Sequence, residues 1–229
     1  MANLAIIPAR GGSKRILRKN IKDFFGKPVI AYSIEAALKS GLFSEVMVST
    51  DDKEIAELAQ KHGAKVPFMR SEKNSDDHAT TLDVVKEVVS DYQKLENKSF
   101  ENICCIYPTA PFIEINNLEE GYKKLVNLKL DSVFPVVESS NPVWRGFELD
   151  LEGKAKFIWP EFNNARSQDL RKVYFDAGQW YWIRLSSLKD SIFSDNSGTI
   201  LLKAEAVQDI DSESDWRLAE LKYKLIHEA

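Results

Sequence analysis

The sequence predicts an α/β fold in which a mostly parallel sheet is flanked by helices. Short apolar runs alternate along the chain with longer segments whose apolar residues recur at helical spacing, which is typical of βαβ units. The 229 residues are enough to bury one large core, and 44% hydrophobic with 29% charged residues is an ordinary globular composition. We therefore expect residues 1–229 to form a single domain.

The apolar runs indicate where the strands lie. The first run precedes a glycine-rich loop, and the run at residues 103–107 is apolar throughout, as in a strand that is buried on both faces. The expected strands are, in chain order, residues 4–7, 45–49, 66–69, 103–107, 132–137, 177–183 and 199–202.

Capping residues indicate where the helices begin. Pro28 suits the first turn of one helix, either Asp51 or Asp52 is placed to cap a second, and either Thr80 or Thr81 starts a third. The expected helices are, in chain order, about residues 28–38, 52–62, 80–92, 118–128 and 212–227.

The stretch from about residue 138 to 173 departs from this pattern. Prolines, glycines and tryptophans interrupt it too often for a long helix or strand. We expect an inserted arm or hairpin here, and we expect this arm to make the contact between two subunits.

The overall charge and the apolar content exclude several classes of protein. A formal net charge of −4 provides no global field for holding nucleic acid or an anionic membrane. No apolar run approaches the roughly 20 residues that cross a bilayer, and a signal peptide is not apparent. Cys104 and Cys105 are adjacent and match no metal or redox spacing, so we interpret them as core residues in a reducing compartment. These observations predict a cytoplasmic protein.

The loop after the first strand is the most informative segment, because residues 6–15 read IIPARGGSKR. Glycines let backbone N–H groups approach phosphate oxygens, while arginine and lysine supply charge-assisted hydrogen bonds. Seven basic residues within residues 1–27 stand against a single acid, Asp23. A polyanionic ligand explains this excess, although a solvated basic loop is the alternative. Neither the Walker A pattern nor GxGxxG is present, which disfavours P-loop NTPases and NAD enzymes.

Two carboxylates near the end of the sequence favour a metal site. In the segment QDID, Asp209 and Asp211 share one face if the backbone is extended. Such a pair suits Mg²⁺ together with substrate phosphate oxygens. The alternative is that Asp211 or Ser212 caps the last helix. Both interpretations can hold if one residue caps and another binds the metal.

A third cluster, RSQD at residues 166–169, closes the irregular stretch. Its guanidinium, amide and carboxylate groups could bind an acidic sugar. The aromatic side chains of DAGQWYW at residues 176–182 are more typical of a core or an interface.

Taken together, these motifs resemble those of the acylneuraminate cytidylyltransferases, and the resemblance covers nearly the whole chain. It implies a Rossmann-like fold of the nucleotide-diphospho-sugar transferase type, a CTP-dependent cytidylyltransferase activity with Mg²⁺, and a homodimer whose arms reach the partner's site. The segments that carry it are IIPARGGSKRI with Lys19 and Asn20, STD at 49–51, YPTAP at 107–111, RSQD at 166–169 and QDID at 208–211.

Within that family the chain looks most like the pseudaminic acid cytidylyltransferases, which serve bacterial surface and flagellin sugar biosynthesis. The likeness implies transfer of CMP from CTP to a nine-carbon 2-keto-3-deoxy sugar acid, with release of pyrophosphate. Sialic acid enzymes usually carry glutamine in place of Tyr107 and asparagine-glycine in place of residues 177–179, which disfavours sialic acid. Arg171 departs from the pseudaminic acid pattern, where a proline is common.

The resemblance also implies a role for individual residues. Asp209 and Asp211 would hold Mg²⁺. The sugar would be bound by Arg166, Gln168 and Asp169. The CTP triphosphate would be held by Arg10, Gly11, Gly12, Ser13, Lys14 and Lys19, and the rest of the nucleotide by Asn20, Arg70 and Thr109. The catalytic residues implied are Arg10, Lys14 and Lys19, which would stabilise charge on the leaving group, and Asp211, which would act through Mg²⁺.

Other functions remain open at this point. A sialic, legionaminic or eight-carbon keto-sugar acid could replace pseudaminic acid as the acceptor, and UTP or GTP could replace CTP. A non-catalytic nucleotide-binding module is a more distant alternative. The basic loop and the carboxylates of Asp209 and Asp211 argue against a non-catalytic module.

Overall fold

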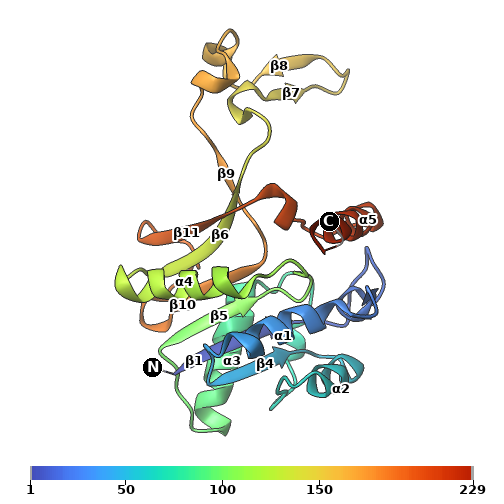
Figure 1. The fold of residues 1–229 in the computed structure, drawn as a ribbon, viewed down its shortest axis with the longest axis vertical. Coiled ribbons are helices and arrows are strands. Elements are labelled where there is room, and N and C mark those ends of the chain that lie inside the picture. Colours follow the sequence, from blue (N-terminus) through green and yellow to red (C-terminus); the bar gives the residue numbers. More distant parts are fainter. Residues whose placement is uncertain (1, 228–229) are drawn as a thin grey trace.

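The computed structural model describes residues 2–227, and within them seven strands form one mixed sheet (Figure 1). Strands β4, β1, β5, β6 and β11 run in one direction, while β9 and β10 run in the other. The expected α/β fold with a mostly parallel sheet is confirmed. The spatial order is β11 (Ser197–Leu202), β6 (Ser132–Glu138), β10 (Trp180–Arg184), β5 (Asn102–Ile106), β1 (Asn3–Pro8) and β4 (Glu45–Ser49), with β9 (Tyr174–Asp176) paired to β6.

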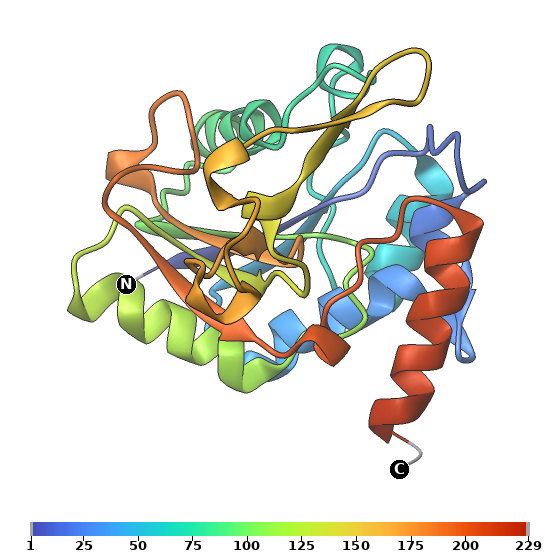
Figure 2. The ribbon, with the colours of Figure 1, turned by 90° about the horizontal axis from the view of Figure 1, so that it is seen from above.

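Helices cover both faces of the sheet (Figure 2). Alternate residues of β1 show the two layers: Ala5 and Ile7 pack in the core cluster that includes α1, α2 and α4, whereas Leu4 and Ile6 pack against α3. All four side chains are fully buried. The helices are α1 (Val29–Ser40), α2 (Lys53–Lys61), α3 (Thr81–Leu95), α4 (Ile115–Asn127) and α5 (Glu213–His227).

Side-chain caps begin three of these helices, as their sequences predicted. Asp52 accepts a hydrogen bond from Ile55 N at 3.1 Å, so Asp52 rather than Asp51 caps α2. Thr80 and Asp83 form a reciprocal capping box at α3. Ser212 and Asp215 bond reciprocally at the start of α5. Each cap satisfies N–H groups that the first helical turn leaves without a partner.

One expected strand is wrong. Residues 66–69 form no strand, and only Lys65 makes a bridge, to Met47 of β4. Lys65 donates its backbone N–H to Val46 O at 2.8 Å and accepts from Val48 N at 2.9 Å. Pro67 has no N–H to donate, so this pairing cannot continue along the edge of the sheet.

The segment between β6 and β9 leaves the sheet and projects away from it, at the top of Figure 1. It contains a small hairpin of β7 (Phe147–Leu149) and β8 (Ala155–Phe157). Trp144 packs edge-on against Trp159 and Phe162, with ring centroids 5.4 and 5.7 Å apart. We refer to residues 139–173 as the arm. A second hairpin, which we did not expect from the sequence, joins β2 (Asp23–Phe24) to β3 (Lys27–Pro28).

The two cysteines lie in β5 with no exposed surface, and both are free thiols. Burial raises the pKa of Cys104 well above its ordinary value and that of Cys105 to about 12. The interpretation of both as core residues is confirmed. None of the helices in residues 2–227 has the length and apolar character needed to cross a membrane.

Gly121 on α4 allows the helix to approach the sheet, which gives a first prediction. A methyl group added there would lie 2.6 Å from Cη2 of the fully buried Trp180. Overpacking costs about 1–3 kcal/mol, while replacing a helical glycine by alanine returns at most about 1 kcal/mol. We expect Gly121→Ala to lower the free energy of unfolding by about 1–2 kcal/mol in urea titrations. Asn116→Ala, at an exposed position of the same helix, should change it by less than about 0.5 kcal/mol. A Gly121→Ala protein as stable as the parent would contradict this account of the packing.

Candidate active site

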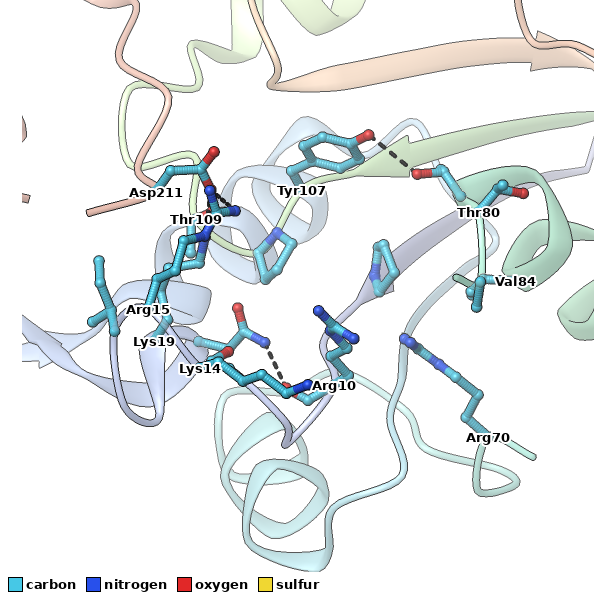
Figure 3. Close-up of a pocket in the computed structure, with 17 residues that line it drawn as sticks. Arg10, Lys14, Arg15, Lys19, Arg70, Thr80, Val84, Tyr107, Thr109 and Asp211 are labelled. Atoms are coloured by element: carbon cyan, nitrogen blue, oxygen red, sulfur yellow. Dashed lines mark hydrogen bonds and ion pairs between the residues drawn. The ribbon is translucent and has the colours of Figure 1, made fainter. Parts of the chain in front are cut away.

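A cavity of about 420 Å³ lies where β1 and β5 end (Figure 3). The carboxyl ends of parallel strands meet at one edge of a sheet, which is where open α/β folds bind ligands. Residues from well-separated parts of the sequence line it: Pro8, Arg10, Ser13, Lys14, Arg15, Ile16, Lys19, Asn20, Arg70, Ala79, Thr80, Thr81, Val84, Tyr107, Pro108, Thr109 and Asp211.

The loop after β1 supplies most of the cations of this cavity. The amide of the buried Asn20 donates to Arg10 O at 2.9 Å, which ties the end of the loop to its beginning. Gly11 N donates to Asp51 Oδ1 at 2.9 Å, and a side chain on Gly11 would lie 2.6 Å from Asp52 Oδ2. A side chain at this position would therefore displace the Asp52 carboxylate, which caps α2. A side chain on Gly12 would meet no atom within 4 Å. Neither Gly11 nor Gly12 is among the residues that line the cavity.

The basic side chains of the loop are held by specific acceptors. Lys19 Nζ donates to Ile210 O at 2.6 Å and lies 3.5 Å from Asp211 Oδ1. Arg15 forms an ion pair of 2.7 Å with the same Asp211 oxygen. Figure 3 shows Arg15 and Lys19 beside Asp211, whereas the side chain of Lys14 extends toward Arg10. These contacts join the first 20 residues to a segment that follows the whole sheet.

Arg70 is the buried cation of the site. Its Nε donates to Ser49 Oγ at 3.0 Å, and its Nη2 donates to Ser49 O. Burial lowers the pKa of the guanidinium, while the carboxylates of Asp51 and Glu87 oppose this shift. Arg70 and Thr109, which the family resemblance assigned to the nucleotide, both line the cavity.

The two carboxylates of the QDID segment are close enough to influence each other. Because Ser212 caps α5, the carboxylate of Asp211 is free of the helix and lies at the cavity. Asp209 lies two residues earlier and is not a lining residue. Partial desolvation raises the pKa of Asp209, the charge of Asp211 raises it further, and Lys19 acts in the opposite direction. A divalent cation would relieve this repulsion, so the pair fits the Mg²⁺ expected from the sequence.

The three residues expected on the sugar side lie elsewhere. Arg166, Gln168 and Asp169 are exposed on the arm, and Arg166 Nε pairs with Asp169 Oδ2 at 2.9 Å. None of the three lines the central cavity. Gln168, together with Arg171 and Lys172, borders a separate cavity of about 310 Å³ within the arm.

Sequence reasoning missed several residues of this region. Arg15 belongs to the basic loop but has no assigned role, and Tyr107 belongs to the YPTAP segment without being assigned to the site. Thr81 accepts from or donates to the Tyr107 hydroxyl at 3.1 Å, although it was considered only as a helix start. Asp77 pairs with Arg10 at 2.7 Å and with Lys14. No motif pointed to Asp77, because it follows a loop without periodicity.

Comparison with known proteins identifies the family of the chain. The family model described as "Cytidylyltransferase" matches residues 4–146. The chain belongs to the cytidylyltransferase family. It is therefore a CTP-dependent nucleotidyltransferase.

Full-length relatives carry more specific names. The chain is 42% identical to "Pseudaminic acid cytidylyltransferase" of Campylobacter jejuni subsp. jejuni (strain 81-176), covering 100% of this chain and 99% of the relative. It is 32% identical to "CMP-N,N'-diacetyllegionaminic acid synthase" of Legionella pneumophila, again over 100% of this chain and 99% of the relative. A solved CMP:2-keto-3-deoxy-manno-octonic acid synthetase in complex with CTP superposes with a TM-score of 0.68 at 20% identity, covering all of both chains. This structural likeness shows that the two proteins share a fold.

The Asn20 contact provides a second prediction. Asn20→Asp keeps the shape of the side chain but replaces the N–H that bonds Arg10 O with an oxygen. A buried group left without its partner costs about 1–3 kcal/mol, so we expect this loss in the free energy of unfolding, measured in urea. The loop should also bind CTP less tightly in calorimetric titrations. Asn164→Asp makes the same change at an exposed position and should alter neither quantity. Unchanged stability of Asn20→Asp would show that the loop does not depend on this bond.

Proposed function

We propose that this enzyme transfers CMP from CTP to pseudaminic acid and releases pyrophosphate. The observation that carries the proposal is a single cavity lined by Arg10, Lys14, Arg15 and Lys19, with Asp211 paired to the last two. Four cations suit a triphosphate, and the carboxylate suits the metal ion that accompanies it. The choice of sugar follows the relative that is 42% identical over its full length.

In this proposal the loop after β1 binds the phosphates. The triphosphate is held by Arg10, Gly11, Gly12, Ser13, Lys14 and Lys19, and the remainder of the nucleotide by Asn20, Arg70 and Thr109. Gly12 would contribute its backbone N–H rather than a side chain. Gly11, whose N–H is bonded to Asp51 Oδ1, would act by letting the loop pass close to Asp52.

Asp209 and Asp211 would hold Mg²⁺, which when bound neutralises phosphate charge and polarises the phosphorus–oxygen bond that breaks. The anomeric hydroxyl of the sugar attacks the α-phosphorus and loses its proton to water, the bond from the α-phosphorus to the bridging oxygen breaks, and pyrophosphate leaves with that electron pair. Arg10, Lys14 and Lys19 stabilise the negative charge that gathers on the leaving group. Lys19 can do this while bonded to Ile210 O, because an ammonium group has three donors.

The arm would provide the sugar side of a neighbouring subunit. Arg166, Gln168 and Asp169 lie outside the central cavity of their own chain, so they serve it only if the arm of one subunit crosses to another. Exposed apolar side chains on the arm, Phe147 and Leu149, favour a covered surface there. The proposed enzyme is therefore a homodimer. A cytoplasmic location is part of the proposal, since its cysteines are free thiols.

Substrate specificity is the third prediction. Purified protein with Mg²⁺ should release pyrophosphate from CTP and pseudaminic acid, but not from ATP, GTP or UTP with the same sugar. Sialic acid, legionaminic acid and an eight-carbon keto-sugar acid, each paired with CTP, are the comparison reactions. A faster reaction with one of these acids would replace the proposed sugar while retaining the chemistry. Failure of every pair would leave a nucleotide-binding module.

The fourth prediction concerns the metal ion. Asp211→Asn removes a charge from the proposed Mg²⁺ pair while keeping the shape of the side chain. We expect Mg²⁺-dependent pyrophosphate release to fall by about 100-fold or more, with the urea midpoint nearly unchanged. Asp195→Asn, at an exposed position away from the cavity, should retain full activity. Residual activity of Asp211→Asn near that of the parent would remove Asp211 from the catalytic residues.

The fifth prediction tests whether the arms cross. Asp211→Asn inactivates a cavity, whereas Arg166→Ala alters an arm. If each arm serves the opposite subunit, a hybrid of the two variants contains one intact site. Unfolding and refolding an equal mixture should then recover about one quarter of the parental activity, since half of the dimers are hybrids with one working site. Recovery no greater than the average of the two separate variants would place the arm on its own subunit or outside the reaction.

A further inference from the structure

We propose that Asp77 is a positioning residue, which orients Arg10 and Lys14 toward the phosphates without touching the substrate. The inference rests on the proposed binding of the CTP phosphates by these two cations. Asp77 is not among the residues that line the cavity, so its contacts with the two cations are its route to the site.

The contact with Arg10 uses one edge of the guanidinium. Arg10 Nη1 donates to Asp77 Oδ1 at 2.7 Å and to Asp76 O at 2.8 Å. Both hydrogens of Nη1 are thereby used. The remaining three N–H bonds of the guanidinium, on Nε and Nη2, are available for an anion. The group is thus held at one end and can donate from the other.

The same carboxylate also holds Lys14. Asp77 Oδ2 accepts from Lys14 Nζ, while Oδ1 accepts from Arg10, so each oxygen serves one cation. Hydrogen bonds from Lys14 and then from Arg10 lower the pKa of Asp77, which keeps the carboxylate charged. A single negative group between two positive ones offsets their mutual repulsion and fixes their spacing. The ammonium of Lys14 keeps two further donors for phosphate oxygens.

The loop that carries Asp77 is itself anchored. Asp76 Oδ1 accepts from His78 N at 2.9 Å and from Ala79 N at 2.8 Å, which closes a local turn. Upstream, Ser71 N donates to Glu87 Oε1 on α3 at 2.7 Å, and the side chain of Asn74 donates to the other oxygen of Glu87. Asp77 therefore has a fixed base on α3, from which it can hold two side chains of the loop after β1.

A carboxylate near the phosphates could instead compete with them for the cations. Whether neutralising Asp77 weakens or tightens CTP binding distinguishes positioning from competition. If Asp77 merely competed with phosphate for the cations, neutralising it would tighten binding. If it positions them, neutralising it weakens binding, because Arg10 and Lys14 then sample conformations that do not face the phosphates. The two used hydrogens of Arg10 Nη1 favour positioning, since the donors toward the phosphates are different ones.

The experiment measures CTP and pyrophosphate binding by calorimetry, with Mg²⁺ and without sugar. Asp77→Asn is expected to weaken both by about tenfold, and Asp77→Glu to recover part of the loss. In an Arg10→Ala background, Asp77→Asn should cost only about twofold, because much of its route to the ligand is already lost. Glu72→Gln removes one charge from an exposed position of the same loop and should leave both affinities unchanged. The urea midpoints of all variants establish that they are folded.

Each other outcome overturns the inference. Tighter CTP binding by Asp77→Asn would make Asp77 a competitor of phosphate. No change would make its ion pairs irrelevant to the ligand, and an equal loss in the Arg10→Ala background would mean that it acts by another route. The single variants Arg10→Ala and Lys14→Ala distinguish a failure of this inference from a failure of the proposed function. If neither weakens CTP binding, the phosphate assignment itself fails, whereas if they do and Asp77→Asn does not, only the role of Asp77 fails.

Discussion

The arrangement of the molecule depends on β1, a strand without polar side chains between Leu4 and Ile7 and without exposed surface there. Its two faces must both be covered, which requires helices on either side of the sheet. Its parallel pairing with β4 and β5 makes all three strands end at the same edge. The segments that follow them, beginning at Ala9, Thr50 and Tyr107, consequently meet. The hydrophobic requirement of one strand therefore decides where polar chemistry is possible.

The charged groups around that edge contribute to orientation more than to stability. Arg15 and Asp211 are both well exposed, and ion pairs in such surroundings typically add no more than about 1 kcal/mol. Arg70 differs because it is buried and bonded to Ser49 of β4. The guanidinium of Arg70 is thus fixed by the core, whereas the other cations are held by carboxylates and carbonyl groups around the cavity. The acidic protein as a whole can therefore present a locally basic cavity.

Most of the sheet and the position of the site could be predicted from the sequence, because both follow from local patterns. Apolar runs marked β1, β4 and β5, and the residue types of the loop after β1 indicated phosphate binding. The strand predicted at residues 66–69 was wrong because the prediction relied on the apolar residues there. Pro67 lacks the N–H that a paired strand needs. Asp77 could not be predicted in this way, because its role depends on contacts with Arg10 and Lys14, which lie more than 60 residues away in the sequence. Roles that came only from the family resemblance, such as that of Gln168, stay predictions.

The bond from Lys19 to Ile210 O closes the cavity with a segment that the ribosome makes after every strand of the sheet. During synthesis, the N-terminal part of a chain folds first. A nascent chain that already contains the complete sheet therefore still lacks Asp211, and with it one wall of the cavity. The basic loop can emerge and fold while the carboxylates that would share a metal ion with its ligand do not yet exist. Asp211 therefore joins the cavity only after every strand of the sheet has been made.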